Sequence, residues 1–131
     1  MLATLVLLPA ALAAQQKKSA APRWTEIGKT SQGNPVFLET RSVKRANGVA
    51  TATVRTVFSK PVKFAQGNVT SSRTIAMFDC AKRTVAVKEN WFYADEKKGT
   101  VIEHRAPKVP GYGSPIKGTL PEIAMNHHCK K

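Results

Sequence analysis

Two stretches of alternating apolar and polar residues, joined by a short polar corner, occupy residues 73–93 near the middle of the chain. In the second stretch the larger apolar residues recur at alternate positions, at Val85, Val87, Trp91 and Tyr93. The other face of this stretch carries Ala86, Lys88 and Asn90, and Glu89 interrupts the apolar face. A period of two residues is typical of a strand with one buried side. The pattern therefore predicts a central β-hairpin.

Turn-forming residues divide the rest of the chain into further short strands. Residues 32–34, Gln-Gly-Asn, predict the turn of a first hairpin, and Asn47-Gly48 predicts a tight turn before a strand over residues 49–58. In that strand alternate residues are expected to face inward, namely Ala50, Ala52, Val54 and Phe58. Proline and glycine in residues 59–68 predict a loop. A charged turn at residues 94–99 then leads into a last strand over residues 100–105.

The C-terminal part combines a long irregular segment with a short helix. Prolines and glycines between residues 107 and 118 exclude regular structure there, and Tyr112 could be either an exposed contact or a plug against the sheet. Thr119 and Glu122 have the spacing of a capping box at the start of a helix. Its inner face is expected to carry Ile123, Ala124 and His127.

The first residues have the pattern of an export signal. Residues 1–14 form an uncharged apolar run that ends in small residues, which predicts a signal peptide, and it is too short to serve as a membrane anchor. Residues 15–23 are polar and basic and predict a flexible segment. Residues 24–131 then form a single domain. No cysteine follows the small residues to carry a lipid, so we expect a product without a membrane anchor.

Two cysteines, Cys80 and Cys129, are present in the chain. In an exported protein they are most simply one disulfide, and the alternative is a pair of reduced, buried thiols. Such a bond would tie the C-terminal helix to the central hairpin. The sequence thus predicts an α+β fold, in which a small antiparallel sheet of about five to six strands carries a C-terminal helix fixed by a disulfide.

The chain is strongly basic. Its 131 residues include 21 Lys and Arg against 8 Asp and Glu, a formal net charge of +13 that favours anionic partners. Basic residues cluster in the first half, and we predict a ligand-binding basic face formed by Arg41, Lys44, Arg45, Arg55, Lys60 and Lys63. The simpler alternative is that these charges keep a secreted protein soluble.

The sequence offers little support for catalysis or for a metal or cofactor. Adjacent helical residues point about 100° apart, so His127, His128 and Cys129 cannot close on one ion together. The acidic pair Asp95 and Glu96 lies among lysines in a turn, where exposed ion pairs explain it better than a hydrolase site does. We therefore expect no enzyme activity and no cofactor.

Several segments resemble the surface-adhesin protein E family of Gram-negative bacteria. They are residues 36–39 and 42–43, the segment Phe78-Asp79-Cys80-Ala81-Lys82-Arg83, residues 92–93 and 99–101, and residues 115–123 with the closing Cys129-Lys130. The resemblance implies a small antiparallel sheet with a disulfide-tied helix, export to the periplasm or cell surface, and binding of host matrix proteins.

These observations lead to two functional hypotheses. The first is a non-enzymatic, adhesin-like binding protein of the cell envelope, whose basic face engages an acidic protein or an anionic glycan. The alternative is a secreted nucleic-acid-binding or nuclease-like effector, which shares the charge but needs exposed aromatic residues for base stacking. Dimerisation through a sheet edge is a further expectation.

Overall fold

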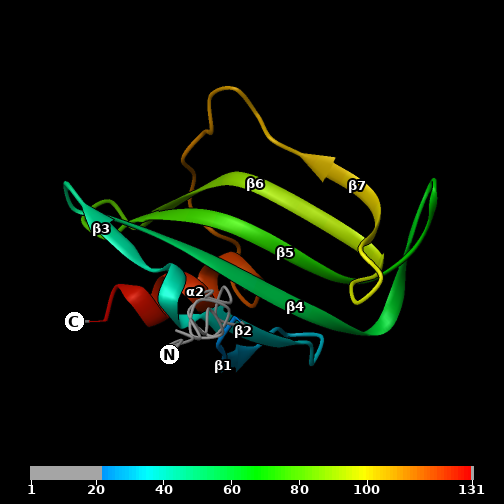
Figure 1. Cartoon of the computed structure of the whole chain (residues 1–131). Coiled ribbons are helices and arrows are strands. Elements are labelled where there is room, and N and C mark those ends of the chain that lie inside the picture. The colour runs from blue at the N-terminus through cyan, green and yellow to red at the C-terminus, as the bar shows by residue number, and fades with distance from the viewer. Residues whose placement is uncertain (1–21, 131) are drawn as a thin grey trace, which may run out of the picture.

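Among the residues that the structure describes, one antiparallel sheet carries one α-helix on one face (Figure 1). The computed structural model describes residues 22–130, and the predicted signal peptide lies outside them. The strands are β1 (Trp24–Lys29), β2 (Pro35–Glu39), β3 (Lys44–Ala46), β4 (Val49–Phe64), β5 (Gly67–Asp79), β6 (Thr84–Asp95) and β7 (Thr100–Arg105). The 3-10 turn η1 (Thr40–Ser42) follows β2, and the helix α2 (Leu120–His128) ends the chain. The predicted α+β class is therefore confirmed.

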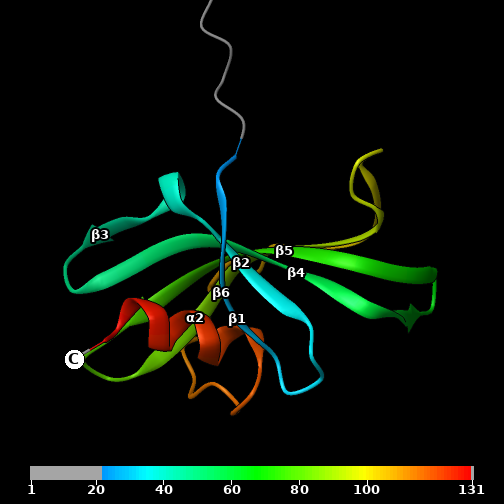
Figure 2. The ribbon, with the colours of Figure 1, turned by 90° about the horizontal axis from the view of Figure 1, so that it is seen from below.

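The spatial order of the strands is β1-β2-β4-β5-β6-β7, and the short β3 pairs with β4 beyond the end of β2. Figure 2 shows α2 and the β1–β2 hairpin lying on the same side of the long central strands. Within residues 22–130, β1 and β7 each have one edge without a strand partner. No helix in this part of the chain is long and apolar enough to cross a membrane.

The central hairpin is confirmed as β5 and β6, but the prediction that Trp91 and Tyr93 share a face with Val85 and Val87 is wrong. Ala76 pairs with Val87 and Ile75 pairs with Glu89, so Lys88 is an extra residue on β6, a β-bulge. Because side chains alternate along a strand, the bulge moves Trp91 to the face opposite Val87. Asn90 is thereby brought onto the same face as Val87.

The β4–β5 hairpin is longer than the sequence indicated. The predicted loop at residues 59–68 is wrong, since β4 continues to Phe64 and only two residues separate it from β5. Pro61 is tolerated because it lies between Val57 and Val62, where the pairing with β5 shifts its register. The turn at Asn47-Gly48 is confirmed, with φ angles of 53° and 77° that suit this pair.

The core lies between α2 and the covered face of the sheet. Its centre includes Val54 and Phe78, whose side chains are fully buried, and the inward orientation predicted for residues 50, 52 and 54 is confirmed. The helix approaches β1 closely: a Cβ on Gly28 would lie 2.9 Å from Cγ2 of Ile123. Any larger residue at position 28 would therefore push the helix away from the sheet.

The buried side of α2 differs from the prediction by one position. Ala124, Met125 and His128 are buried, whereas Ile123 and His127 are only partly covered. Because Cys129 must reach Cys80, the helix is rotated so that His128 faces Phe78, with ring centroids 5.1 Å apart. His128 therefore occupies the inner position that the apolar pattern assigned to His127.

The start of α2 also departs from the expected capping box. Thr119 is the N-cap residue, but its hydroxyl donates to the carbonyl oxygen of Ile116 and makes no bond to the helix. Oε1 of Glu122 accepts a hydrogen bond from the backbone N–H of Gly118, at 2.9 Å. The irregular segment and the first turn of the helix are thus tied to each other.

The disulfide joins Cys80 to Cys129 across a sequence separation of 49 residues, as predicted. The irregular segment before α2 is held by backbone hydrogen bonds between Val85 and Gly113. Tyr112 beside them is 47% exposed, so the reading of this residue as a plug is wrong. The backbone of its neighbour Gly113 fixes the segment to the sheet instead.

Candidate functional site

Three segments distant in the sequence meet at one end of the sheet. Val49 at the start of β4 pairs with Asp79 at the end of β5, so the β3–β4 and β5–β6 turns lie together. The disulfide brings the C-terminal end of α2 to the same place. We call the lysines and arginines of this region the basic end; they are Lys44, Arg45, Lys82, Arg83 and Lys130.

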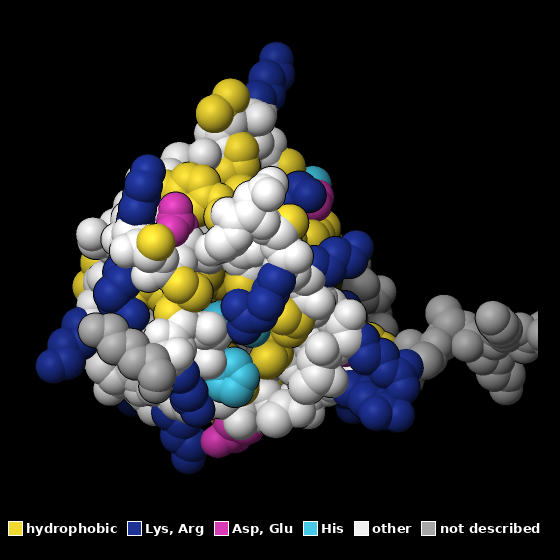
Figure 3. Space-filling model, turned by 90° about the vertical axis from the view of Figure 1, so that its left-hand side faces the viewer, with side chains coloured by type: hydrophobic (Ala, Val, Ile, Leu, Met, Phe, Trp, Pro, Cys, Tyr) yellow, Lys and Arg dark blue, Asp and Glu magenta, His cyan; other side chains and the backbone are white. Residues whose placement is uncertain are grey.

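Figure 3 views this end and shows Lys and Arg side chains spread around it with few acidic side chains between them. Next to the disulfide lies an open hollow of about 560 Å³. It is lined by Arg45, Cys80, Ala81, Arg83, His128, Cys129 and Lys130. Three of these seven residues are basic and none is acidic, so the hollow suits a negatively charged group.

Two contacts hold arginines of the basic end in place. Nη2 of Arg83 donates to Oδ1 of Asn126 at 2.7 Å, and Nη2 of Arg45 donates to the carbonyl oxygen of His128 at 3.4 Å. Both contacts are made to α2, and a cation near the C-terminal end of a helix complements the helix dipole. Neither contact uses a carboxylate, so neither of them compensates the positive charge of its arginine.

The histidines of α2 add no charge here at neutral pH. Burial, with smaller contributions from His127 and Arg45, lowers the pKa of His128 from 6.5 to about 4. Burial and the charge of Lys130 also lower the pKa of His127. The positive potential of this end therefore comes from its lysines and arginines.

A second set of arginines lies on the face of the sheet that α2 leaves open. Arg55 on β4 and Arg73 on β5 are directly opposite each other, an arrangement that is unfavourable for like charges. Glu96 compensates by accepting hydrogen bonds from both, with Oε1 2.7 Å from Nη2 of Arg55. The ring of Trp24 lies against both guanidinium groups, 5.4 and 5.2 Å from its centroid. We call these four residues the paired-arginine cluster.

The carboxylate of Glu96 is held in its charged form. Its burial acts to raise the pKa, but hydrogen bonds from Arg55, Arg73 and Ser71 outweigh that effect and leave the pKa below 4.5. Its side chain is only 11% exposed. One carboxylate thus offsets half of the positive charge of the two arginines from within the cluster.

The six predicted ligand-binding residues are not brought together. Lys44 and Arg45 lie at the basic end and Arg41 lies in η1 just before them, whereas Arg55 belongs to the paired-arginine cluster. Lys60 and Lys63 lie near the opposite end of β4, and Thr51, the partner of Lys44, is nine residues before Lys60, about 30 Å along the strand. One ligand of small size cannot contact all six.

The predicted ligand-binding set did not include Lys82, Arg83 and Lys130 of the basic end, although their positions beside the cysteines indicated them. Lys82 and Arg83 follow Cys80 closely, and Lys130 follows Cys129 directly. A disulfide between the two cysteines necessarily brings these flanking charges together. In residues 22–130 all ion pairs involve strands β4 to β7 or the turn after β6, and none includes a side chain of the basic end.

The described residues offer no evident site for metal chemistry. Between Pro22 and Lys130 no three His, Cys, Asp or Glu residues are grouped closely enough to hold an ion. Both cysteines are used in the disulfide, which leaves no thiolate there.

Comparison with known proteins identifies related folds and the family of the chain. Its fold is similar to two structures of Haemophilus influenzae protein E, each at 15% sequence identity. In crystal form II the TM-score is 0.55, with 86% of this chain and 96% of that chain covered; in the other structure it is 0.53, with 84% and 90% covered. No curated protein sequence matches significantly. The sequence profile of the surface-adhesin protein E family matches residues 24–130, and the chain belongs to that family.

Proposed function

We propose that this protein is an exported, non-enzymatic adhesin of the cell envelope that binds an acidic protein segment or an anionic glycan at its basic end. Membership of the surface-adhesin protein E family supports the adhesin role. The choice of an anionic ligand rests on one observation, which is that the two sets of arginines differ in their ion pairs. The arginines of the open face share a carboxylate, whereas those of the basic end make no ion pair within residues 22–130.

The nucleic-acid alternative receives less support from the geometry. Single-stranded nucleic acid is usually held by aromatic rings that stack on bases beside a basic groove. None of the residues that line the hollow at the basic end is Phe, Trp or Tyr. Trp91, moved by the bulge onto the open face, stacks instead on His104, with ring centroids 5.2 Å apart.

A direct test measures binding to a heparin fragment as the probe. We expect the double variant Lys82→Gln and Arg83→Gln to weaken binding about ten-fold, because two uncompensated charges are removed from one site. The matched control is Lys60→Gln with Lys63→Gln, which removes the same charge from the far end of β4. Affinity of the unaltered protein should also fall as salt is raised, because screening weakens contacts between exposed charges.

Two results would contradict the proposal. Equal weakening by the two double variants would mean that only the net charge matters. Affinity that does not change between low and high salt would exclude an electrostatic site. A gel shift with single-stranded and double-stranded DNA tests the alternative function. Tighter binding of DNA than of heparin in the same buffer would favour that alternative.

A further inference from the structure

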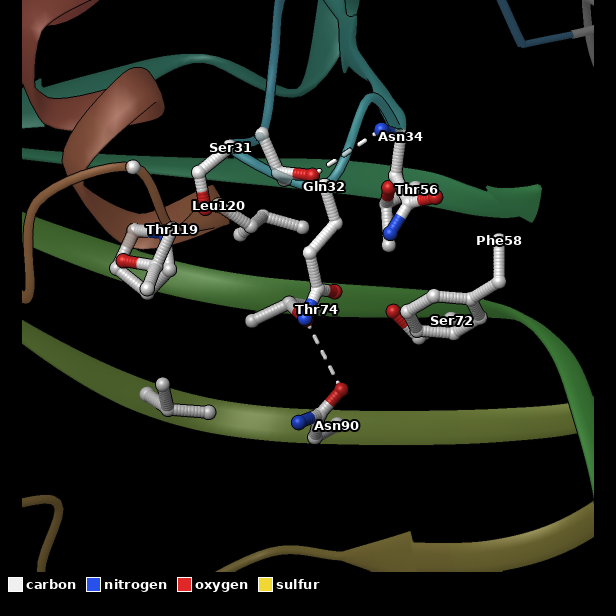
Figure 4. Close-up of a pocket in the computed structure, with 14 residues that line it drawn as sticks. Ser31, Gln32, Asn34, Thr56, Phe58, Ser72, Thr74, Asn90, Thr119 and Leu120 are labelled. Carbon is white, nitrogen blue, oxygen red and sulfur yellow. Dashed lines mark hydrogen bonds between the residues drawn. The ribbon is translucent and has the colours of Figure 1, made fainter. Parts of the chain in front are cut away.

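A second cavity lies at the other end of α2, between the start of the helix, the β1–β2 turn and the sheet (Figure 4). Its volume is about 320 Å³, at the lower end of the range of about 300–1,000 Å³ that is typical of small-molecule sites. The residues that line it are Thr30, Ser31, Gln32, Asn34, Thr56, Phe58, Ser72, Thr74, Val87, Asn90, Gly118, Thr119, Leu120 and Pro121. None of them is charged, in a protein whose net charge is +13.

The floor of this cavity is formed by polar residues of β4 and β5. Elsewhere the same face of these two strands carries apolar residues. On β4 the buried series Ala50, Ala52 and Val54 is followed by Thr56, and on β5 the series Phe78 and Ala76 is followed by Thr74 and Ser72. These three hydroxyl residues are only 4% exposed. Burying hydroxyl groups is unfavourable unless they find hydrogen-bond partners. Two of these hydroxyls have partners within the fold, since Thr56 donates to the carbonyl oxygen of Pro35 at 2.8 Å and Thr74 donates to Asn90. A hydroxyl oxygen that donates can still accept a hydrogen bond, so both retain acceptor capacity.

The polar groups are oriented in advance. The Thr74 hydroxyl donates to Oδ1 of Asn90 at 2.9 Å, which leaves the side-chain NH₂ of Asn90 as a donor (Figure 4). Oδ1 of Asn34 likewise accepts from the backbone and the hydroxyl of Ser59, and so its NH₂ is also left as a donor. Gln32 extends from the β1–β2 turn over the same floor (Figure 4). Amides and hydroxyls held in this way provide both donors and acceptors without any charge.

The cavity also has apolar surface on two sides. Phe58 lies on the floor beside Ser72, and Leu120 lies on the helix side (Figure 4). Pro121, also in α2, lines the cavity too. At the rim the β1–β2 turn is joined to the segment before α2, because the backbone N–H of Ser31 donates to the carbonyl oxygen of Gly118 at 2.9 Å. A Cβ on Gly118 would lie 2.9 Å from Cβ of Ser31, so only glycine allows this approach.

From this geometry we infer that the cavity is a binding site for a neutral saccharide of one or two rings. Sugar hydroxyls both donate and accept hydrogen bonds, as the amides and hydroxyls of the floor do. The C–H faces of a sugar ring match Phe58 and Leu120, and an uncharged lining places no penalty on an uncharged ligand. This site is separate from the basic end, and the inference does not depend on the function proposed above.

The test is an NMR titration with N,N′-diacetylchitobiose, whose acetamido groups add an amide and a methyl group. We expect saturable shifts confined to amides around the cavity, at residues 30–34, 72–74, 90 and 118–120. Gln32→Ala should weaken binding about three- to ten-fold, the usual loss for one hydrogen bond. Gln66→Ala is the matched control, because Gln66 is an exposed glutamine in the β4–β5 turn and should leave affinity unchanged. Gln32→Trp should fill the mouth and abolish binding.

Salt and variants of the basic end separate this inference from the proposed function. Affinity should stay constant between about 50 and about 500 mM NaCl, since no charge takes part. It should also survive the double variant Lys82→Gln and Arg83→Gln. The inference is overturned if neither diacetylchitobiose nor maltose shifts these amides, if Gln66→Ala weakens binding as much as Gln32→Ala does, or if a capped uncharged peptide binds here and the disaccharides do not.

Discussion

The two groups of arginines show how the same side chain has different consequences in different surroundings. At the paired-arginine cluster, Arg55 and Arg73 face each other on neighbouring strands and share Glu96, so their charge is used within the fold. At the basic end, Arg45 and Arg83 donate hydrogen bonds to a carbonyl and an amide oxygen, and neither makes an ion pair with a residue between 22 and 130. The first group stabilises the open face, and the second remains available to a ligand.

The largest effect should come from breaking the bond that assembles the basic end. Replacing Cys80 or Cys129 by serine should lower the free energy of unfolding by about 4 kcal/mol, the value expected for a closed loop of this length. It should also separate Lys130 from Arg83 and weaken heparin binding. Denaturant unfolding of the single and double variants checks this.

The double cysteine variant provides the control for that experiment. It should be little less stable than either single variant, because each single change already breaks the bond. Single variants that unfold like the unaltered protein would show that the bond contributes nothing to the docking of α2.

The next effect concerns His128, which lies beneath the basic end. Its pKa in the folded protein is lowered to about 4, so below its unfolded value of 6.5 the unfolded chain binds more protons. The contribution of His128 to the free energy of unfolding is therefore present above pH 6.5 and is lost as the pH falls toward about 4. We expect a loss of about 2 kcal/mol between about pH 7 and about pH 5.

Urea unfolding at a series of pH values measures this loss. His128→Phe, which keeps a ring against Phe78, should flatten the profile, whereas His127→Gln should retain most of it. A profile in His128→Phe as steep as that of the unaltered protein would assign the pH dependence to other groups.

A smaller effect is expected at the paired-arginine cluster. Glu96→Gln leaves Arg55 and Arg73 opposed without a counter-charge, which should cost about 1 to 2 kcal/mol after allowance for their partial exposure. The same variant should tighten binding of anions to the open face. Thermal unfolding and heparin binding are the measurements.

Two controls sharpen the contrast between the regions. Glu26→Gln removes an exposed acid from β1 and should change stability by less than about 0.5 kcal/mol. The double variant Lys82→Gln and Arg83→Gln should be equally mild, because its residues are exposed. If that variant destabilised the fold more than Glu96→Gln does, the basic end and not the paired-arginine cluster would be the group that stabilises the fold.

The sequence predicted the central hairpin, the disulfide and the terminal helix because each depends on local pattern or on simple pairing. Turn residues such as Asn47-Gly48 act within a few positions, and two cysteines allow only one intramolecular bond. The pairing of Arg55 with Glu96 could not be predicted, since 41 residues separate them and only the folded sheet makes them neighbours. The cavity at the start of α2 was missed for the same reason, because its hydroxyls come from several strands.

The bulge at Lys88 reverses the alternation of inward and outward side chains between the two halves of β6. Before it, odd-numbered residues such as Val85 and Val87 point toward the helix; after it, even-numbered residues such as Asn90 do. Deleting this one residue would make the strand regular and turn the later half inside out, with Trp91 directed into the cavity floor and Asn90 onto the open face. One extra residue thus decides which chemistry each side of the sheet displays.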